Sequence, residues 1–198
     1  MKTITVKHST GAYSIYVGEH ILGEALAAVL ADASYDRVFL VSDSNVYALW
    51  GEHFRAEFAK TGRTLAGSHV FEAGEQNKTL ATVSDMYAAF QRASLTRKSL
   101  VIAMGGGVCG DMTGFAAATY LRGIDVMQIP TTLLSQIDSS IGGKTGVDLS
   151  VGKNLVGAFK QPIAVIADSC FLDTLPQRYL NDGMGEALKY GCIADAAL

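Results

Sequence analysis

The chain has 198 residues, 49% of them hydrophobic, which is enough to bury a substantial core in one domain or in one domain and part of another. The 16 basic and 19 acidic residues give a formal net charge of −3 and are spread without blocks, which argues against a surface for nucleic acid or an anionic membrane. No run reaches the roughly 18 apolar residues of a membrane span, and the first residues alternate like a strand rather than a signal peptide. We therefore expect a cytoplasmic protein that binds neither nucleic acid nor a membrane.

The three cysteines, Cys109, Cys170 and Cys192, are far apart and lack the spacing of a disulfide framework or a zinc site. We expect reduced thiols, mostly buried. The final residues, from Cys192 to Leu198, contain no capping signal or closing element, so we also expect the chain to be truncated.

Alternating residues over 3–7 and 13–17 predict an antiparallel hairpin at the N-terminus. Beyond it, apolar strand-like runs alternate with helix-period stretches, which predicts βαβ units around a parallel sheet. The expected strands are 37–41, 65–71, 100–104, 125–129 and 163–167, and the expected helices are 20–31, 52–61, 80–94 and 111–120. The run 100–104 is apolar throughout, as in a strand covered on both faces near the centre of a sheet. The predicted class is α/β, with a Rossmann-like parallel sheet.

The best candidate for a domain border is Pro176. Residues 1–175 are expected to form the α/β domain. Residues 176–198 have helical spacing but are too short to bury a core of their own, so we interpret them as the start of a second, α-helical domain.

Gly105, Gly107 and Gly110 match the pattern G-x-G-x-x-G directly after an expected central strand and before an expected helix. Glycines at these positions let the backbone approach a pyrophosphate, which the N–H groups at the helix start bind. The alternative is an ordinary tight turn. The loop follows a late strand, and no acidic residue ends the next strand to take the ribose hydroxyls. Asp43-Ser44-Asn45, after an earlier strand, predicts either a ribose contact or the N-cap of the next helix.

A polar, glycine-rich stretch runs from Thr131 to Asn154. Its segment 142–145 resembles the end of a P-loop, but Asp138 stands where that motif needs its first glycine, which disfavours a P-loop NTPase. Lys144 and Lys153 each follow a glycine, and a flexible ammonium on an unobstructed backbone suits a phosphate or a carboxylate. The alternative is two surface lysines in a loop.

Glu186 and Lys189 share one face of the expected final helix because three positions separate them, and Tyr190 lies beside Glu186. Spacing alone favours a surface ion pair over a functional site, because such pairs are common and weak.

Several motifs follow one another along the chain: GGGVCGD (105–111), YLRG (120–123), PTTLL (130–134), DSSIGGKTG (138–146), GKNLVG (152–157) and GEALKYG (185–191). Together they resemble the 3-dehydroquinate synthase family of sugar phosphate cyclases. The resemblance is dense from Gly105 to Gly191 and thinner before it.

The resemblance implies a two-domain, NAD-dependent enzyme that acts as a homodimer and holds a divalent metal, zinc or cobalt, in the cleft between its domains. It implies conversion of the sugar phosphate DAHP (3-deoxy-D-arabino-heptulosonate 7-phosphate) to 3-dehydroquinate and phosphate in the shikimate pathway, with transient reduction of NAD. By the same resemblance, the NAD contacts are Asp43, Asn45, Glu75, Lys78, Gly106, Gly107, Val108, Asp111, Thr131, Thr132, Lys144, Lys153, Phe171 and Thr174.

The resemblance also implies roles for five polar residues outside the glycine loop. Lys144 and Asn154 would bind the substrate phosphate, and Asp138 and Lys189 would face the substrate hydroxyls. Arg122 would reach the phosphate site of a neighbouring subunit.

Glu186 would be the first of three metal ligands, which reverses the interpretation from spacing alone. The family's other two ligands are histidines of the helical domain. The histidines of this chain all lie too early to serve: His8, His20, His53 and His69. A single carboxylate does not hold zinc, so the chain by itself is expected to be inactive.

Three alternatives remain open at this point. Two lie in the same superfamily: another sugar phosphate cyclase, and a glycerol-type dehydrogenase that uses NAD for net oxidation. The third is a non-catalytic NAD-binding module. Lys144 and the pair Lys153-Asn154 favour the dehydroquinate branch.

Overall fold

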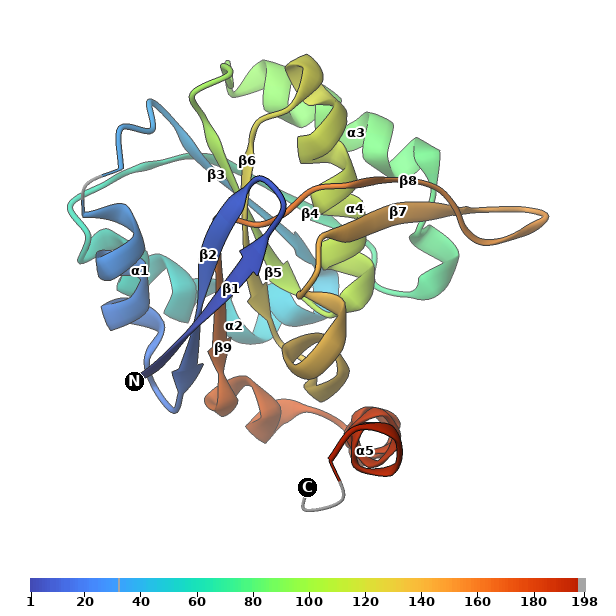
Figure 1. Cartoon of the computed structure of the whole chain (residues 1–198). Helices are drawn as coiled ribbons and strands as arrows, with labels where there is room; N and C mark the ends of the chain where they lie inside the picture. Colours follow the sequence, from blue (N-terminus) through green and yellow to red (C-terminus); the bar gives the residue numbers. More distant parts are fainter. Residues whose placement is uncertain (32, 196–198) are drawn as a thin grey trace.

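The computed structural model describes residues 1–31 and 33–195, in which a seven-stranded sheet runs in the order β1-β2-β9-β6-β5-β3-β4 (Figure 1). Strands β1 and β2 form an antiparallel hairpin, and the other neighbouring strands are parallel. The strands are β1 (Lys2–His8), β2 (Gly11–Gly18), β3 (Val38–Asp43), β4 (Leu65–Phe71), β5 (Leu100–Gly105), β6 (Asp125–Pro130) and β9 (Ala164–Asp168). This arrangement confirms the α/β class with an N-terminal hairpin.

Helices cover both faces of the sheet (Figure 1). α1 (Leu22–Leu30) and α2 (Ser44–Ala59) bury apolar side chains against one face, and α3 (Leu80–Arg92) and α4 (Gly107–Thr119) against the other. Strand β5 lies between β6 and β3 with every residue buried, as its unbroken apolar run predicts. Helix α5 (Gln177–Ile193) lies beyond the carboxyl ends of the strands.

Two helices begin earlier than the sequence predicts. α2 starts at Ser44 rather than at Glu52. The Asp43 side chain accepts two N–H groups of the first turn and so caps the helix ahead of the stretch with a clear helical period. α4 starts at Gly107 rather than at Asp111, because glycines in its first turn hide the helical periodicity.

The stretch interpreted as a glycine-rich loop with two lysines contains a second sheet, the antiparallel pair β7 (Lys144–Leu149) and β8 (Gly152–Phe159). The sequence did not predict these strands, because polar residues and glycines interrupt the apolar alternation. A Cβ atom on Gly157 would lie 2.1 Å from the carbonyl oxygen of Thr145, so the close pairing of the two strands requires glycine there. The β7–β8 hairpin runs along α4 and extends away from the main sheet (Figure 1).

Short turns complete the edges of the sheet. η1 (Glu75–Asn77), the π-helical η3 (Ser135–Ser139) and η4 (Ser169–Thr174) come after strands and gather at the carboxyl edge, whereas η2 (Tyr120–Arg122) precedes β6 at the amino edge. In the described part of the chain, no helix is long and apolar enough to cross a membrane. The border at Pro176, between domains 1–175 and 176–198, stays a prediction.

Candidate functional site

The glycine loop leads from the end of β5 into α4. Gly106 is extended (φ −75°, ψ −171°), and within residues 1–31 and 33–195 no side chain caps the helix that follows it. The N–H groups of the first helical turn therefore point towards the carboxyl edge of the sheet, an arrangement that suits an anion. A Cβ atom on Gly106 would lie 3.1 Å from Thr132, and one on Gly107 would lie 3.0 Å from Ser139, so glycine lets the neighbouring segments approach the loop closely.

A cavity of about 780 Å³ opens beside this loop, within the size range of cofactor sites. We call it the nucleotide cavity. Its walls contain most of the predicted NAD contacts: Asp43, Asn45, Glu75, Lys78, Gly106, Gly107, Val108, Asp111, Thr131, Thr132, Phe171 and Thr174. The structure thus brings together residues from distant parts of the sequence, while their contacts with NAD stay predictions.

Two buried hydroxyl groups in the walls of this cavity have no hydrogen-bond partner in the described part of the chain. They belong to Thr131, which is 4% exposed, and to Ser139. A buried polar atom without a partner costs about 1–3 kcal/mol, so a polar ligand that supplies partners would be stabilised here. With the uncapped start of α4, these hydroxyls fit the phosphates and sugars of a dinucleotide. The sequence did not single out Ser139, although its place beside Asp138 in a family motif was a usable signal.

Asp43 is the N-cap of α2, which confirms one of its two sequence interpretations. Its Oδ1 atom accepts the N–H groups of Asn45 and Val46, both at 3.0 Å. Burial raises the pKa of this carboxyl group, while the two N–H groups oppose that rise. A Cβ atom on Gly105 would lie 3.1 Å from Asp43 Oδ2, so the carboxylate lies beside the glycine loop. A ribose contact from the same side chain stays a prediction.

An aromatic pair forms another part of the wall of the nucleotide cavity. The rings of Trp50 and Phe171 meet edge to face, with centroids 5.0 Å apart, and the Trp50 indole N–H donates to Thr174 Oγ1 at 2.9 Å. Sequence reasoning missed Trp50, because an aromatic residue inside a helix gives no signal that separates a cavity wall from an ordinary core.

A second cavity, of about 470 Å³, lies between α4 and the β7–β8 hairpin, and we call it the phosphate cavity. Its walls include Asp138, Lys144 and Asn154, which the sequence placed at the substrate. Asp111 and Ser139 line both cavities, so the two spaces are adjacent. Ligands in the two cavities would therefore lie side by side near the start of α4.

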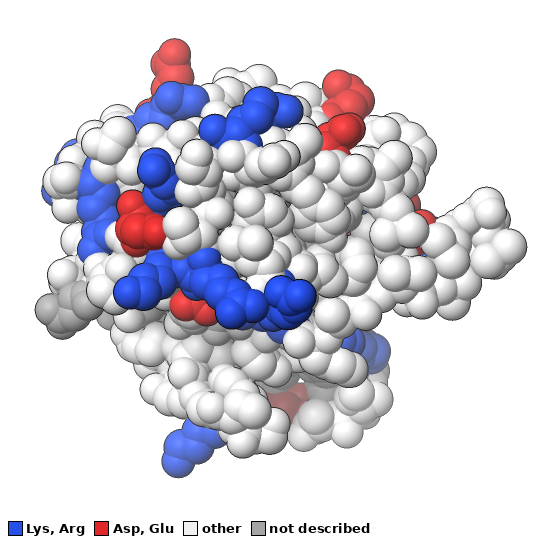
Figure 2. Space-filling view, turned by 90° about the horizontal axis from the view of Figure 1, so that it is seen from above, with Lys and Arg blue, Asp and Glu red and all other residues white. Residues whose placement is uncertain are grey.

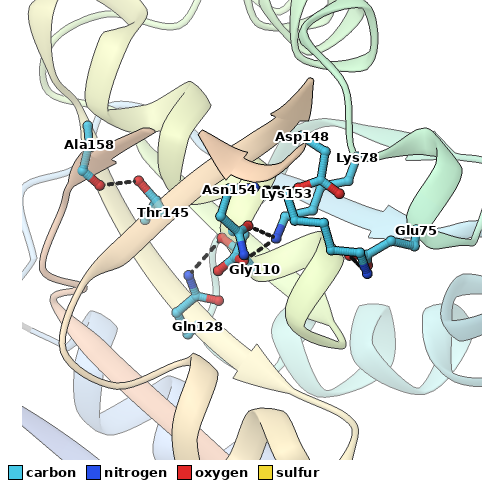
Figure 3. Close-up of polar contacts among 10 residues, drawn as sticks. Glu75, Lys78, Gly110, Gln128, Thr145, Asp148, Lys153, Asn154 and Ala158 are labelled. Atoms are coloured by element: carbon cyan, nitrogen blue, oxygen red, sulfur yellow. Dashed lines mark hydrogen bonds and ion pairs between the residues drawn. The ribbon is translucent and has the colours of Figure 1, made fainter. Parts of the chain in front are cut away.

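Lys78 is buried between these elements (Figure 3). Its ammonium donates to Asp111 Oδ2 and to Asn154 Oδ1, each at 2.6 Å. Burial raises the pKa of the Asp111 carboxyl group, and the bond from Lys78 opposes that rise. Lys153, by contrast, is exposed outside both cavity walls, and its ammonium pairs with Glu75 at 2.9 Å. In the part of the chain that the structure describes, Lys153 is linked to the nucleotide cavity through Glu75.

On α5, Lys189 donates to Glu186 across three positions, so the ion pair favoured by spacing alone is present. That bond is the main reason why the pKa of Glu186 is lowered. The Tyr190 hydroxyl donates to Asp138 Oδ1 at 3.1 Å, and desolvation, followed by this hydrogen bond, raises the pKa of Tyr190 to about 12. Tyr190 thus joins α5 to the phosphate cavity, a contact that sequence reasoning missed.

The described residues do not form a metal site by themselves. Across residues 1–31 and 33–195, no group of three or more His, Cys, Asp or Glu side chains could hold a metal ion. Glu186 supplies one carboxylate, and a catalytic zinc needs three protein ligands. Its role as a metal ligand therefore stays a prediction.

Arg122 lies far from the two cavities in the fold. It belongs to η2, ahead of β6, at the amino edge of the sheet, and its φ is +69°. Arg37 directly precedes β3, and Arg97 and Lys98 lie in the turn before β5, so these residues are also at this edge. Figure 2, which views the molecule from above, shows basic side chains gathered over this face. Arg122 cannot act in the cavities of its own chain.

A protein-family comparison matches residues 68–182 to the N-terminal domain of 3-dehydroquinate synthase. The 3-dehydroquinate synthase of Clostridium acetobutylicum is 46% identical over 198 residues, which is 100% of this chain and 55% of that protein. The enzyme of the same name from Symbiobacterium thermophilum is 52% identical over 184 residues, 92% of this chain and 51% of that protein. The chain thus spans about half the length of the curated relatives that it matches.

The chain is also similar to solved structures of other proteins. A 2-deoxy-scyllo-inosose synthase in complex with carbaglucose-6-phosphate, NAD+ and Co2+ has a TM-score of 0.85 and 33% identity, covering 95% of this chain and 50% of its own. The 2-epi-5-epi-valiolone synthase of Streptomyces hygroscopicus, with NAD+ and Zn2+ bound, has a TM-score of 0.84 and 34% identity, covering 100% of this chain and 53% of its own. A maleylacetate reductase from Agrobacterium tumefaciens is 17% identical with a TM-score of 0.70, a likeness of fold alone.

Proposed function

This chain belongs to the 3-dehydroquinate synthase family, and we propose that it forms the NAD-binding half of an enzyme that converts DAHP to 3-dehydroquinate and phosphate. The reaction is a carbon–oxygen lysis followed by ring closure, in the shikimate route to aromatic amino acids. Relatives solved with NAD+ and with Co2+ or Zn2+ support the choice of cofactors.

The observation that carries the proposal is the junction of the two cavities at Asp111. An uncapped helix start with closely packed glycines faces the nucleotide cavity, and Lys144 and Asn154 face the adjacent phosphate cavity. An enzyme that oxidises a phosphorylated sugar and then expels its phosphate needs a dinucleotide and a phosphate group held next to each other. A module that only bound NAD would have no use for the second cavity.

The residues of this chain would divide the work as follows. NAD, when bound, would supply the redox chemistry, accepting a hydride from the carbon that carries a substrate hydroxyl and later returning it. Lys144 and Asn154 would bind the substrate phosphate, and the lysine ammonium would stabilise its charge as the carbon–oxygen bond breaks. Asp138 would accept a hydrogen bond from a substrate hydroxyl, since the single bond from the Tyr190 hydroxyl to Oδ1 holds the carboxylate in place and leaves its other acceptor sites to the substrate. Lys189, paired with Glu186, would donate to the substrate from α5.

The proposal includes a divalent metal that this part of the chain would hold only in part. Glu186 would be one ligand, and the remaining ligands would have to come from outside residues 1–31 and 33–195. We expect the 198 residues alone to bind NAD without turning over substrate.

The proposal extends to the assembly and the compartment of the protein. We propose a homodimer in which Arg122, at the amino edge, serves the phosphate cavity of the neighbouring subunit. We also propose the cytoplasm as the compartment, because Cys109 and Cys170 are buried free thiols.

The test is an assay of the full-length enzyme that contains this chain. With DAHP it should release phosphate without accumulation of NADH. Lys144→Met should lower kcat/KM for DAHP about a hundredfold or more, because the variant loses a charge-assisted contact to the leaving group. Lys160→Met, which removes an equal charge outside the phosphate cavity, should remain close to the parent enzyme.

Steady accumulation of NADH from glycerol, without phosphate release, would contradict the proposal and indicate a dehydrogenase. NAD binding without either reaction in the full-length enzyme would instead indicate a non-catalytic module.

A further inference from the structure

Lys78 occupies a position that a simple cofactor contact does not need. It is 4% exposed, and two of the three N–H groups of its ammonium donate hydrogen bonds, one to Asp111 and one to Asn154. Lys78 lines the nucleotide cavity, Asn154 lines the phosphate cavity, and Asp111 lines both. One ammonium therefore connects the walls of two binding sites.

The backbone of Lys78 also contacts the β7–β8 hairpin, close to Asn154. Its carbonyl oxygen accepts the N–H of Asp148 at 2.8 Å, and Asp148 Oδ1 accepts the N–H of Asn154 at 2.7 Å. Asn154 adopts a left-handed conformation, with φ at +55°. These bonds close a ring from Lys78 through β7 to β8 and back to the Lys78 ammonium (Figure 3).

The two ends of the β7–β8 hairpin are held in different ways. At the base, β7 packs tightly on α4: a Cβ atom on Gly114 would lie 2.4 Å from Thr145, whose hydroxyl donates to the Ala158 carbonyl at 2.6 Å. At the tip, Val151 is 81% exposed and Leu155 is 59% exposed, so little apolar burial stabilises this part. The order of the tip therefore depends on its polar contacts with Lys78.

We propose that Lys78 is a positioning residue that couples the nucleotide cavity to the phosphate cavity by holding Asn154 in place. The proposal rests on the proposed function, since it takes NAD and phosphate as the two ligands. A nucleotide phosphate at the start of α4 adds negative charge beside the Lys78–Asp111 pair and restricts its motion. The same ammonium holds Asn154 through a hydrogen bond, so a more ordered Lys78–Asp111 pair also makes the tip of the hairpin more ordered. By linkage, phosphate at Asn154 strengthens NAD binding by the same factor.

Hydrogen exchange measured by mass spectrometry tests the coupling without an activity assay. The protein is compared with and without saturating NAD, and two segments are followed: 106–113 at the glycine loop and 146–156 around the hairpin tip. In the parent protein we expect NAD to slow exchange in both segments, on the order of fivefold at the tip. In Lys78→Met, NAD should still slow exchange in 106–113 but no longer in 146–156.

The difference between NAD-bound and NAD-free exchange separates coupling from simple damage, because a purely structural defect speeds exchange at the tip in both states. Lys160→Met is the matched control: it removes an equal charge near the base of the hairpin, and NAD should protect the tip as in the parent. Protection of the tip by NAD in Lys78→Met would overturn the proposal. Absence of NAD protection at 106–113 in the parent would instead contradict the proposed function.

Lys78→Met leaves the Asp111 carboxylate buried without its partner, and this variant can fail to fold. Asn154→Ala then serves as the second variant, because Asn154 is exposed and the substitution cuts the same link from the hairpin side. It should abolish NAD protection of the tip while leaving protection at 106–113. Retained protection of the tip in this variant would equally overturn the proposal.

Discussion

Asp168, at the end of β9, is the residue whose removal should destabilise the fold most clearly. It is fully buried, and its carboxylate accepts N–H groups from Ile21 at 2.7 Å, from Leu22 at 3.0 Å and from Cys170 at 3.2 Å. It also accepts the N–H of His20 at 2.8 Å. One side chain thus joins the start of α1 to the strand that leads into the aromatic wall of the nucleotide cavity.

The magnitude follows from the donors that Asp168→Ala would leave without an acceptor. Those of Ile21, Leu22 and Cys170 are buried, and each unsatisfied buried donor costs about 1–3 kcal/mol. Water admitted by the shortened side chain would satisfy some of them. We therefore expect a loss of roughly 3–5 kcal/mol in the free energy of unfolding. For a chain of this length, that loss corresponds to a fall in Tm of roughly 6–20 °C.

Urea denaturation followed by far-UV circular dichroism would measure this loss. Asp36→Ala is a suitable control: Asp36 is an exposed aspartate that accepts the hydroxyl protons of Thr96 and Ser99, and its loss should cost less than about 1 kcal/mol. If Asp168→Ala were no more destabilising than this control, the carboxylate would not hold α1 to β9 as argued.

Three further predictions concern the thiols and the nucleotide cavity. In the native protein, a thiol reagent such as DTNB should modify exposed Cys192 rapidly and the other two thiols only after denaturation, because burial raises the pKa of Cys170 to about 12 and that of Cys109 further. NAD should quench the fluorescence of Trp50, the single tryptophan, in a saturable way, and an unchanged signal while calorimetry detects binding would contradict its place in the cavity wall. If ribose hydroxyls donate to Asp43, NAD affinity should fall as the pH drops through the pKa of this carboxyl, which burial raises. The loss should thus begin at a higher pH than for an ordinary aspartate, and Asp43→Asn should flatten this pH dependence in titrations from about pH 4 to 8.

The main sheet could be predicted because its strands carry their own signal. The run 100–104 is apolar without interruption, and 65–71 coincides with the observed strand β4. The β7–β8 hairpin could not be predicted, because its strands pair through glycines and leave polar residues on exposed sides. Its stability comes from contacts distant in sequence, such as Lys78 with Asn154, that no local window contains.

The candidate site was predicted as a set of residues but not as an arrangement. The family resemblance identified Lys78, Asp111 and Asn154 as site residues. It assigned the first two to the cofactor and the third to the substrate phosphate. The structure places all three in one hydrogen-bonded group, because η1 and the hairpin meet over α4. Spacing along the chain cannot reveal a lysine whose partners come from 33 and 76 positions away.

Sheet order also explains why the glycine loop departs from the usual dinucleotide pattern. In that pattern an acidic residue ends the next strand along the chain and binds the ribose, whereas here β6 ends in Pro130. Strand β3 lies beside β5 on the other side, so its last residue, Asp43, comes within contact of Gly105 in the loop. The carboxylate is therefore supplied by an earlier strand that is adjacent in space. A chain whose pyrophosphate loop follows a late strand can keep the same chemistry, provided that the strand next to it in the sheet ends in an acid.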